Sequence, residues 1–265
     1  TLSPEKVVRC AKMQDLDAIA ITDHDTCAAI APAIIAAEGL NIEIIPGVEL
    51  TAEIDEDEIH ILGYFIDWRN KLFIKNLEEF CRVREERARE ILRRLGDQGI
   101  YLRYEDLVGI AGHGPCAIGR LHIAQLLYKK GKVASIRDAF IKYIGNNSPA
   151  YVKKFKLSPK EAIDIIKNAG GVSVLAHPKT INIQTMPLKD ILEILVNDGI
   201  QGIEVYHSDH NDRESSLFKK LAEEYNLLIT GGSDCHGFGK KDILLGKVKV
   251  PYELVEKLRE ASHLA

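Results

Sequence analysis

The sequence predicts an α/β protein whose parallel strands close into a barrel, and two observations carry this prediction. Short continuous apolar runs alternate with segments of helical periodicity along most of the 265 residues, as repeated βα units require. Side chains of the metal-binding type follow these apolar runs, at the strand ends where α/β barrels hold their active sites. A doubly wound sheet is the alternative for the same alternation, and we favour the barrel.

The first part of the chain predicts two helices and three strands. It begins at Thr1, without an initiator methionine, on a helix-start signal in which Ser3 is the N-cap and Pro4 the first helical residue. The expected elements are a helix over 4–14, a strand over 17–22, a helix over 27–38 and strands over 42–50 and 59–66. We expect the acidic turn over 55–58 to be a solvated hairpin tip rather than a metal site.

From about residue 70 to residue 150 the pattern changes. Residues 71–95 are heavily charged with a narrow apolar stripe, which predicts a mostly solvated helix. Shorter helices are expected over 104–110, 117–130 and 135–143. No strand is expected here, so we predict a helical insertion over 70–150 within a barrel domain made of 1–69 and 151–265.

The strand–helix alternation then resumes. Ser158 and Pro159 start a helix that ends at Gly170–Gly171. The remaining expected elements are strands over 172–176, 202–206, 227–230 and 246–250, and helices over 187–197, 211–225 and 252–262.

Composition excludes several classes of protein. The chain is 46% hydrophobic and 28% charged with a formal net charge of −4, so it has no global basic excess for binding long nucleic acid, although a local basic patch stays open. Five scattered cysteines without a C-x-x-C pair predict reduced thiols and a cytoplasmic protein. No apolar stretch is long enough to span a membrane, and no stable protein partner is inferred.

Histidines and carboxylates gather at the expected strand ends. The six candidate metal ligands are His24, Glu49, His60, His177, Asp234 and His236. Each alone has a structural alternative, such as a core histidine for His60, but their joint placement is less probable by accident. A mixed set of this kind suits Zn²⁺, Mn²⁺ or Fe²⁺, and six candidates exceed one tetrahedral shell, so more than one ion is expected.

Five segments in order carry a resemblance to a known family. These segments are Ala20–Asp25 (AITDHD), Pro46–Leu50 (PGVEL), His60–Tyr64 (HILGY), Ala176–Pro178 (AHP) and Gly232–Gly237 (GSDCHG). They resemble the successive motifs of the PHP (polymerase and histidinol phosphatase) family. Within it the chain resembles metal-dependent phosphoesterases that include nucleoside 3′,5′-bisphosphate phosphatases and 5′-to-3′ exoribonucleases. Gly119–Ala124 (GRLHIA) resembles a G-R-P-H-I-A stretch, with Leu121 in place of proline.

The resemblance implies a distorted (β/α)₇ TIM-like barrel with up to three divalent metal ions, Mn²⁺ first, with Zn²⁺ or Fe²⁺ as alternatives. Glu49, His60 and His177 would form one site, with Glu49 bridging to a second site that Asp234 joins. His24 and His236 would serve the third. A first strand with an H-x-H pair, followed by an S-D-G segment, precedes the first helix in the family and is absent here, so we expect a fragment of a longer protein.

The function implied is hydrolysis of phosphomonoesters of small nucleotides, or of the 5′ end of short RNA, by a metal-activated water. No serine or cysteine nucleophile is needed. Asp23 and Asp25 are candidates for orienting ligands or water, and His207 for contacting phosphate or protonating the leaving oxygen, with a structural role as the alternative. Arg120, His122 and His210 are the candidates for binding the substrate.

Three other functions are weighed against this one. The helical insertion disfavours a histidinol-phosphate phosphatase, and the order of the motifs disfavours a barrel amidohydrolase. A non-catalytic phosphate-binding or regulatory module remains if the natural chain truly lacks the first ligand pair. The basic–aromatic run over 151–155 (YVKKF) is more typical of a solvated segment than of a nucleic-acid contact.

Overall fold

The computed structural model describes residues 2–55, 57–111, 118–153, 157–181, 186–237 and 244–263. The chain folds as two units, which are described separately. The sheet unit combines Thr1–Ile74 with Lys156–Ala265, and the helical unit is Lys75–Phe155.

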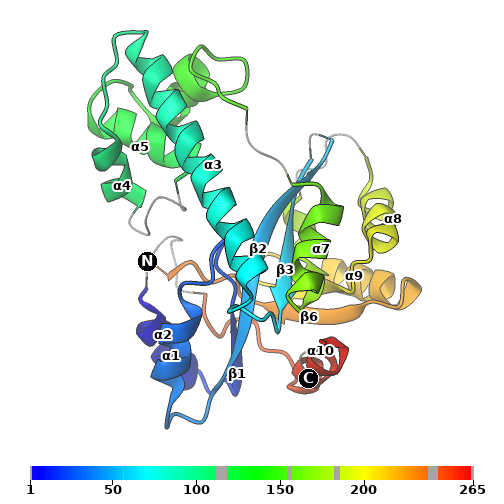
Figure 1. Cartoon of the computed structure of the whole chain (residues 1–265). Coiled ribbons are helices and arrows are strands. Elements are labelled where there is room, and N and C mark those ends of the chain that lie inside the picture. Colours follow the sequence, from blue (N-terminus) through cyan, green and yellow to red (C-terminus); the bar gives the residue numbers. More distant parts are fainter. Residues whose placement is uncertain are drawn as a thin grey trace. The chain divides into compact units, whose positions relative to one another are not determined.

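A curled, six-stranded sheet forms the centre of the sheet unit (Figure 1). Its strands are β1 (Ala18–Ile21), β2 (Glu43–Ile54), β3 (Asp57–Tyr64), β4 (Val172–Leu175), β5 (Gly202–His207) and β6 (Leu228–Gly232). Their order in space follows their order in the chain. The six strands confirm the α/β class, and within the described residues the sheet is a half-barrel rather than a closed one.

The sheet is mixed, which corrects the expectation of a parallel sheet. β1 pairs parallel to β2, and β4, β5 and β6 are parallel neighbours, but β3 runs antiparallel to both β2 and β4. The reason is the short connection between β2 and β3, since a connection of this length joins only antiparallel strands. The reversal places the first half of β3 beside the carboxyl ends of its neighbours.

Helices follow or precede the strands as the sequence indicates. They are α1 (Pro4–Met13), α2 (Ile30–Ala37), α7 (Pro159–Asn168), α8 (Leu188–Asp198), α9 (Asp212–Glu224) and α10 (Glu253–Ala261). Ser158 caps α7 by accepting a hydrogen bond from the Glu161 amide, and Asn211 caps α9. α8 ends where Gly199 adopts a left-handed conformation.

One expected strand, over residues 246–250, is wrong. These residues form a turn and bends instead. Gly246 has a φ of +79°, and the amide of Lys247 donates to the Leu244 carbonyl at 2.9 Å, which closes a turn at the start of the segment. Pro251 follows and has no amide hydrogen to continue a ladder.

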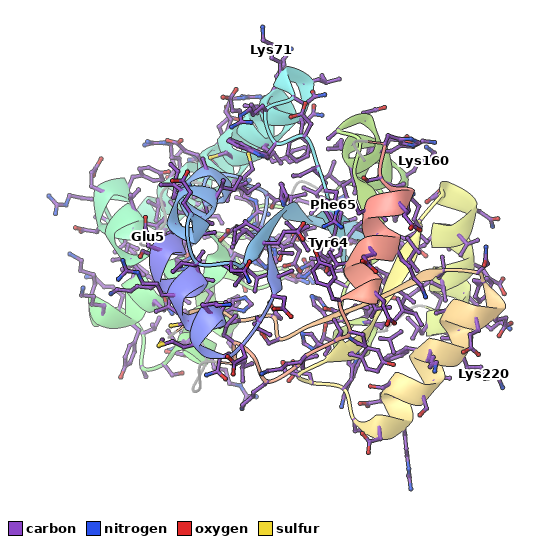
Figure 2. All side chains as sticks on the ribbon, turned by 90° about the horizontal axis from the view of Figure 1, so that it is seen from below. Glu5, Tyr64, Phe65, Lys71, Lys160 and Lys220 are labelled. Carbon is purple, nitrogen blue, oxygen red and sulfur yellow. The ribbon has the colours of Figure 1, made fainter. Side chains whose placement is uncertain are left out.

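The core of the sheet unit is apolar on both sides of the strands. Val174 and Ile203 are completely buried. Tyr64 and Phe65 lie among the crowded side chains around the sheet, whereas Lys160 and Lys220 point outward from their helices (Figure 2). The continuous apolar runs of the sequence therefore correspond to strands covered on both faces.

The helical unit has a separate apolar core. It contains α3 (from Lys71 to Gly96, its first turn in the sheet unit), α4 (Tyr104–Ala111), α5 (Arg120–Lys129), α6 (Ile136–Ala139) and a π-helical turn, η2 (Phe140–Ile144). Leu95, Leu107 and Leu127 are completely buried in this core. The outer face of α3 carries arginine–carboxylate pairs spaced three or four residues apart, as its charge pattern predicts.

The expectation of reduced thiols holds for three cysteines and fails for one. Cys10, Cys27 and Cys235 are free thiols, whereas Cys81 is disulfide-bonded. Sequence spacing cannot reveal such a bond, because pairing depends on the distance between Cα atoms in the folded chain. Cys116 lies outside the described residues.

None of the helices that the structure describes combines the length and the apolar character needed to cross a membrane.

Gly47 in β2 packs closely against the backbones of the neighbouring strands, and its replacement by alanine tests this packing. A Cβ here would lie 2.8 Å from the Gly63 carbonyl oxygen and 3.0 Å from that of Ile21. We expect Gly47→Ala to lower the free energy of unfolding by about 1–3 kcal/mol, because the backbone of two strands must shift. Urea denaturation followed by circular dichroism measures the change.

Gly109→Ala in α4 is the matched control, since nothing lies within 4 Å of a Cβ at this position. It should leave stability unchanged or raise it by up to about 1 kcal/mol, because alanine favours a helix over glycine. Equal effects of the two substitutions would contradict the packing around Gly47.

Candidate metal centre

Three histidines from different strands or strand ends converge on one carboxylate, that of Glu49. Glu49 lies in β2, His60 in β3, His24 just after β1 and His177 just after β4. His60 reaches the centre from within its strand because β3 is reversed, so the first half of β3 lies at the carboxyl ends of β2 and β4. This reversal explains why His60 does not follow its strand as the other histidines do.

The donor atoms of these residues lie close together. Oε1 of Glu49 is 2.7 Å from Nδ1 of His60 and 3.1 Å from Nε2 of His177, and these two nitrogens are 3.2 Å apart. Nε2 of His24 lies 3.6 Å from Oε2 of the same carboxylate. Glu49 is only 5% exposed, so the low dielectric of this buried position strengthens each of these interactions.

The outer nitrogens of two histidines face oxygen atoms. Nδ1 of His177 lies 2.5 Å from the Thr180 hydroxyl, which itself donates to the His177 carbonyl at 3.0 Å. Nε2 of His60 faces Glu58 at 3.5 Å. With a divalent cation bound, these outer partners would hold the ring protons, so that Nε2 of His177 and Nδ1 of His60 could ligate the cation beside Glu49.

The electrostatics of the centre also favour positive charge. Burial alone would raise the pKa of Glu49, but hydrogen bonds from His177 and His60 outweigh it and hold the pKa well below its usual range. Burial alone would lower the pKa of His60, but the hydrogen bonds with Glu49 and Glu58 raise this pKa to about 9. The ionised Glu49 thus retains a cationic partner, the role that a metal ion fills when bound.

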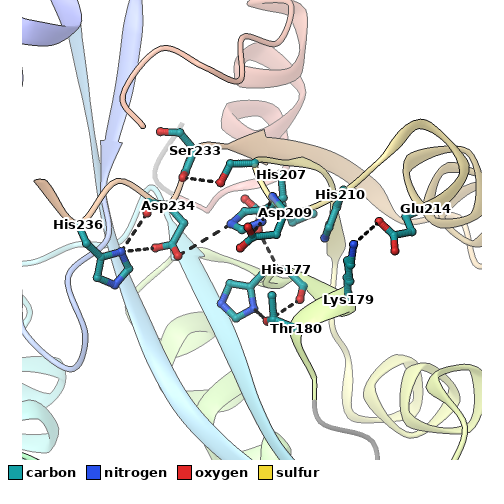
Figure 3. A network of polar contacts seen from close by, with 12 residues as sticks. His177, Lys179, Thr180, His207, Asp209, His210, Glu214, Ser233, Asp234 and His236 are labelled. Carbon is teal, nitrogen blue, oxygen red and sulfur yellow. Dashed lines mark hydrogen bonds and ion pairs between the residues drawn. The ribbon is translucent and has the colours of Figure 1, made fainter. Parts of the chain in front are cut away.

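A second group of polar side chains surrounds Asp234, just after β6 (Figure 3). Its Oδ1 lies 3.2 Å from Nδ1 of His236, and its Oδ2 lies 3.9 Å from Nε2 of His207. Nδ1 of His236 also donates to the Asp234 carbonyl at 2.9 Å, so its lone pair is on Nε2.

The two groups adjoin each other through their imidazole rings. The ring centroids of His24 and His236 are 6.4 Å apart, and those of His177 and His207 are 5.6 Å apart. The structure therefore brings all six candidate ligands to one end of the sheet, with Glu49 central to the first group and Asp234 to the second.

His207 and His210 hold opposite tautomers. Nδ1 of His207 accepts the Asp209 amide hydrogen at 3.1 Å, so the proton is on Nε2, which faces Asp234. Nδ1 of His210 donates to the Val205 carbonyl at 2.9 Å, so Nε2 carries only a lone pair; it is buried and has no hydrogen-bond partner among the described residues. Burial lowers the pKa of both rings, that of His207 to about 4.

Asp23 and Asp25 hold the backbone of Glu49. The Glu49 amide donates to the Asp23 carbonyl at 3.1 Å, and the Asp25 amide donates to the Glu49 carbonyl at 3.0 Å. The β1–β2 pairing therefore continues past the end of β1, which fixes the position from which the Glu49 side chain extends. Asp25 is itself buried.

Three residues of the site adopt a left-handed backbone. The φ angles are 52° for Asp25, 25° for His177 and 46° for Asp234, each shortly after a parallel strand. This conformation costs a non-glycine residue about 1 kcal/mol or more, so the surrounding contacts must hold it.

Arg120 and His122 lie in the helical unit, and the contacts described here are within it. Arg120 donates to the Asn146 side chain at 3.0 Å and lies between the rings of Phe140 and Tyr151, 5.8 and 5.5 Å from their centroids. Nδ1 of His122 accepts the Gly119 amide hydrogen at 3.1 Å and so caps α5.

The sequence analysis missed Glu204 in β5. This carboxylate is 4% exposed, and its Oε2 accepts the amide hydrogen of His177 at 2.8 Å. Burial raises its pKa to about 8 against the effect of that hydrogen bond, and the charges of Glu49 and Asp234 add to the rise. The sequence feature that could have identified Glu204 is its place as a single carboxylate inside the apolar run over 202–206.

Fold and donor set together define an α/β protein with a centre for divalent cations at one end of its sheet. The PHP domain model matches residues 1–150. The 5′-3′ exoribonuclease Rnm of Escherichia coli K12 is 35% identical over 237 residues, which cover 89% of this chain and 80% of that protein. The chain therefore belongs to the PHP family and is a metal-dependent phosphoric ester hydrolase.

Two further proteins are similar along most of their length. The 3′,5′-nucleoside bisphosphate phosphatase of Chromobacterium violaceum is 30% identical over 244 residues, covering 91% of this chain and 85% of that protein. The crystal structure of a Bifidobacterium adolescentis protein, assigned by inference as a metal-dependent phosphoesterase, has a TM-score of 0.82 and 29% identity, and the match covers 99% of this chain and 92% of that one.

The contact between Glu204 and the backbone of His177 is testable by metal affinity. We expect Glu204→Ala to weaken Mn²⁺ binding by about 10- to 100-fold, because the His177 amide loses its acceptor and the left-handed backbone loses its support. Glu204→Gln retains an acceptor oxygen of the same size and should stay within a few-fold of wild type. Calorimetric titration of the metal-depleted protein measures both. Wild-type affinity in the alanine variant would show that the contact does not position His177.

Proposed function

We propose that this protein hydrolyses phosphate esters of small nucleotides of the nucleoside 3′,5′-bisphosphate kind, or of the 5′ end of short RNA. The observation that carries the proposal is the convergence of His60, His177 and His24 on Glu49, a donor set for the cations on which the family's hydrolysis depends. The substrate classes come from the names of two relatives, an exoribonuclease and a bisphosphate phosphatase.

We assign Glu49, His60 and His177 to one cation, Mn²⁺ in preference to Zn²⁺ or Fe²⁺. Glu49 would bridge to a second cation with Asp234, and His24 and His236 would hold a third. Bound cations supply charge for the phosphate oxygens and lower the pKa of a bound water. The low dielectric around Glu49 increases the effect of every charge placed there.

His207 is suited to donate a hydrogen bond from Nε2 to a phosphate oxygen or to the leaving oxygen of the ester. The Asp209 amide fixes its proton on Nε2, and its low pKa keeps the ring neutral near pH 7. His210 presents the opposite group, a lone pair on Nε2, and suits a hydroxyl or amino donor of the substrate. Asp23 and Asp25 are assigned to hold and orient Glu49.

Arg120 and His122 are assigned to substrate phosphate. The guanidinium of Arg120 is planar and always charged, and its contact with Asn146 restricts its orientation. The stretch Gly119–Ala124 also carries part of the family resemblance.

We further propose that the half-barrel belongs to a distorted (β/α)₇ TIM-like barrel, which the similarity to the Bifidobacterium structure supports. A histidinol-phosphate phosphatase is less well supported, because the relatives carry nucleotide and RNA names.

Glu49→Gln tests the metal assignment. We expect release of phosphate from a nucleoside 3′,5′-bisphosphate in the presence of Mn²⁺ to fall by more than about 100-fold, because a bridging ligand has a larger effect than an outer contact. The fold should persist by circular dichroism. Glu53→Gln, farther along β2, is the matched control and should keep most of the activity. Turnover of Glu49→Gln within a few-fold of wild type would refute the assignment.

Arg120→Ala tests the substrate contact. We expect the KM for the bisphosphate to rise about 10-fold with a smaller change in kcat, as for the loss of one hydrogen bond to a charged group. Arg137→Ala on the exposed side of α6 removes the same charge from the same unit as a control. Steady-state kinetics compare the two. If both variants match wild type, the role of Arg120 is limited to its contacts with Asn146 and the aromatic rings.

A further inference from the structure

The charge of the chain is divided unevenly between the two units. Residues 75–155 contain 16 lysines and arginines against nine aspartates and glutamates, a formal net charge of +7. The whole chain carries −4, so the residues of the sheet unit carry −11. Away from bound cations the sheet unit therefore repels a polyanion, and the helical unit attracts one.

Part of this positive charge forms a local surface where α4 begins and α5 ends. Asp106 in α4 pairs with both Arg103 and Lys130, each at 2.9 Å, so one carboxylate offsets two cations. The side chain of Arg103 is 76% exposed. Arg103 directly precedes α4, and a helix N-terminus disfavours a cation, so stabilisation of the helix does not explain it.

The turn after α5 adds two more cations. Lys129 and Lys132 are exposed and form no ion pair within the part of the chain that the structure describes. The amides of Gly131 and Lys132 donate to the carbonyls of Tyr128 and Leu127, both at 2.9 Å, which fixes the backbone from which these side chains extend. On α3, by contrast, Arg82, Arg89 and Arg93 each pair with carboxylates of their own helix.

Two aromatic side chains are exposed within the same stretches of sequence. Tyr128 is 55% exposed and directly precedes Lys129, and Tyr101 is 81% exposed two residues before Arg103. Tyr128 beside the unpaired Lys129, and Tyr101 near the exposed Arg103, provide both groups that hold a single strand of nucleic acid, stacking surfaces for bases and cations for phosphates.

We propose that these six residues form a binding surface for single-stranded RNA, the α4–α5 basic surface: Tyr101, Arg103, Tyr128, Lys129, Lys130 and Lys132. The choice of RNA rests on the proposed function, in which the 5′ end of RNA is one substrate. The surface binds several phosphates and bases of a strand, so it matters for an oligonucleotide and not for a mononucleotide.

The test measures RNA binding to the metal-loaded protein. The probe is a fluorescein-labelled, 12-nucleotide single-stranded RNA with phosphorothioate linkages that resist hydrolysis, read by fluorescence anisotropy. We expect the triple variant Lys129→Gln/Lys130→Gln/Lys132→Gln to raise Kd at least about 10-fold. The slope of log Kd against log salt concentration should fall by about 2 in this variant. Each phosphate contact to a single strand contributes about 0.7 to that slope, and the variant loses three lysines.

A second triple variant in the sheet unit is the matched control. Lys219→Gln/Lys220→Gln/Lys257→Gln removes the same charge from exposed positions on α9 and α10, where Figure 2 shows Lys220 pointing away from the unit. Tyr128→Ala should raise Kd with an unchanged salt slope, since stacking involves no counterion release. A duplex of the same length should bind more weakly, because its bases cannot stack on tyrosines.

Two results would overturn the inference: the same Kd and salt slope for both triple variants, or equal binding of duplex and single strand. Turnover of a nucleoside 3′,5′-bisphosphate should not change in the Lys129/Lys130/Lys132 variant, and an equal loss there would also refute an RNA-specific surface. If the wild type binds RNA through this surface but hydrolyses neither substrate, the proposed function fails and the surface stands.

Discussion

A single buried carboxylate, Glu49, is shared by three imidazoles that come from distant parts of the chain. Ionised and removed from water, it requires positive charge or hydrogen-bond donors on every side. The register of β2 against β3 brings His60 to it, the continued β1–β2 pairing brings His24, and the end of β4 brings His177. The arrangement of the strands is therefore what makes the donor set possible, since only Glu49 and His60 belong to one hairpin and His24 and His177 follow other strands.

The reversal of β3 connects the topology of the sheet to its chemistry. A parallel strand can offer a ligand only from its carboxyl end, whereas β3 offers His60 from its first half and Glu58 beside it. The hairpin between β2 and β3 thus supplies both the central carboxylate and one of its partners. Glu204 in β5 acts on the backbone of His177, whose amide hydrogen it accepts, rather than on a donor atom of the centre.

Much of this arrangement was readable in the sequence, and what was missed has physical causes. Apolar runs ending in Asp23–Asp25 or at His177 predict strands and a candidate site together, because the same residue types recur at the ends of several strands, although each residue alone has a structural alternative. The acidic turn over 55–58 predicts a hairpin, which the antiparallel pairing of β2 and β3 confirms, whereas βα alternation alone predicts parallel strands throughout the sheet. The turn at Gly246 overrode the alternation of lysine and valine over 247–250, since such a pattern reports burial and not backbone conformation.

The left-handed conformations of Asp25, His177 and Asp234 restrict which residues can occupy these positions. A β-branched residue would lose the side-chain chemistry and would also force the backbone out of its present conformation, so the two losses could not be separated. Asparagine tolerates the left-handed region nearly as well as aspartate. At Asp25 and Asp234 it is accordingly the replacement that removes charge while leaving the path of the chain intact, and so it distinguishes the electrostatic from the conformational role of each residue.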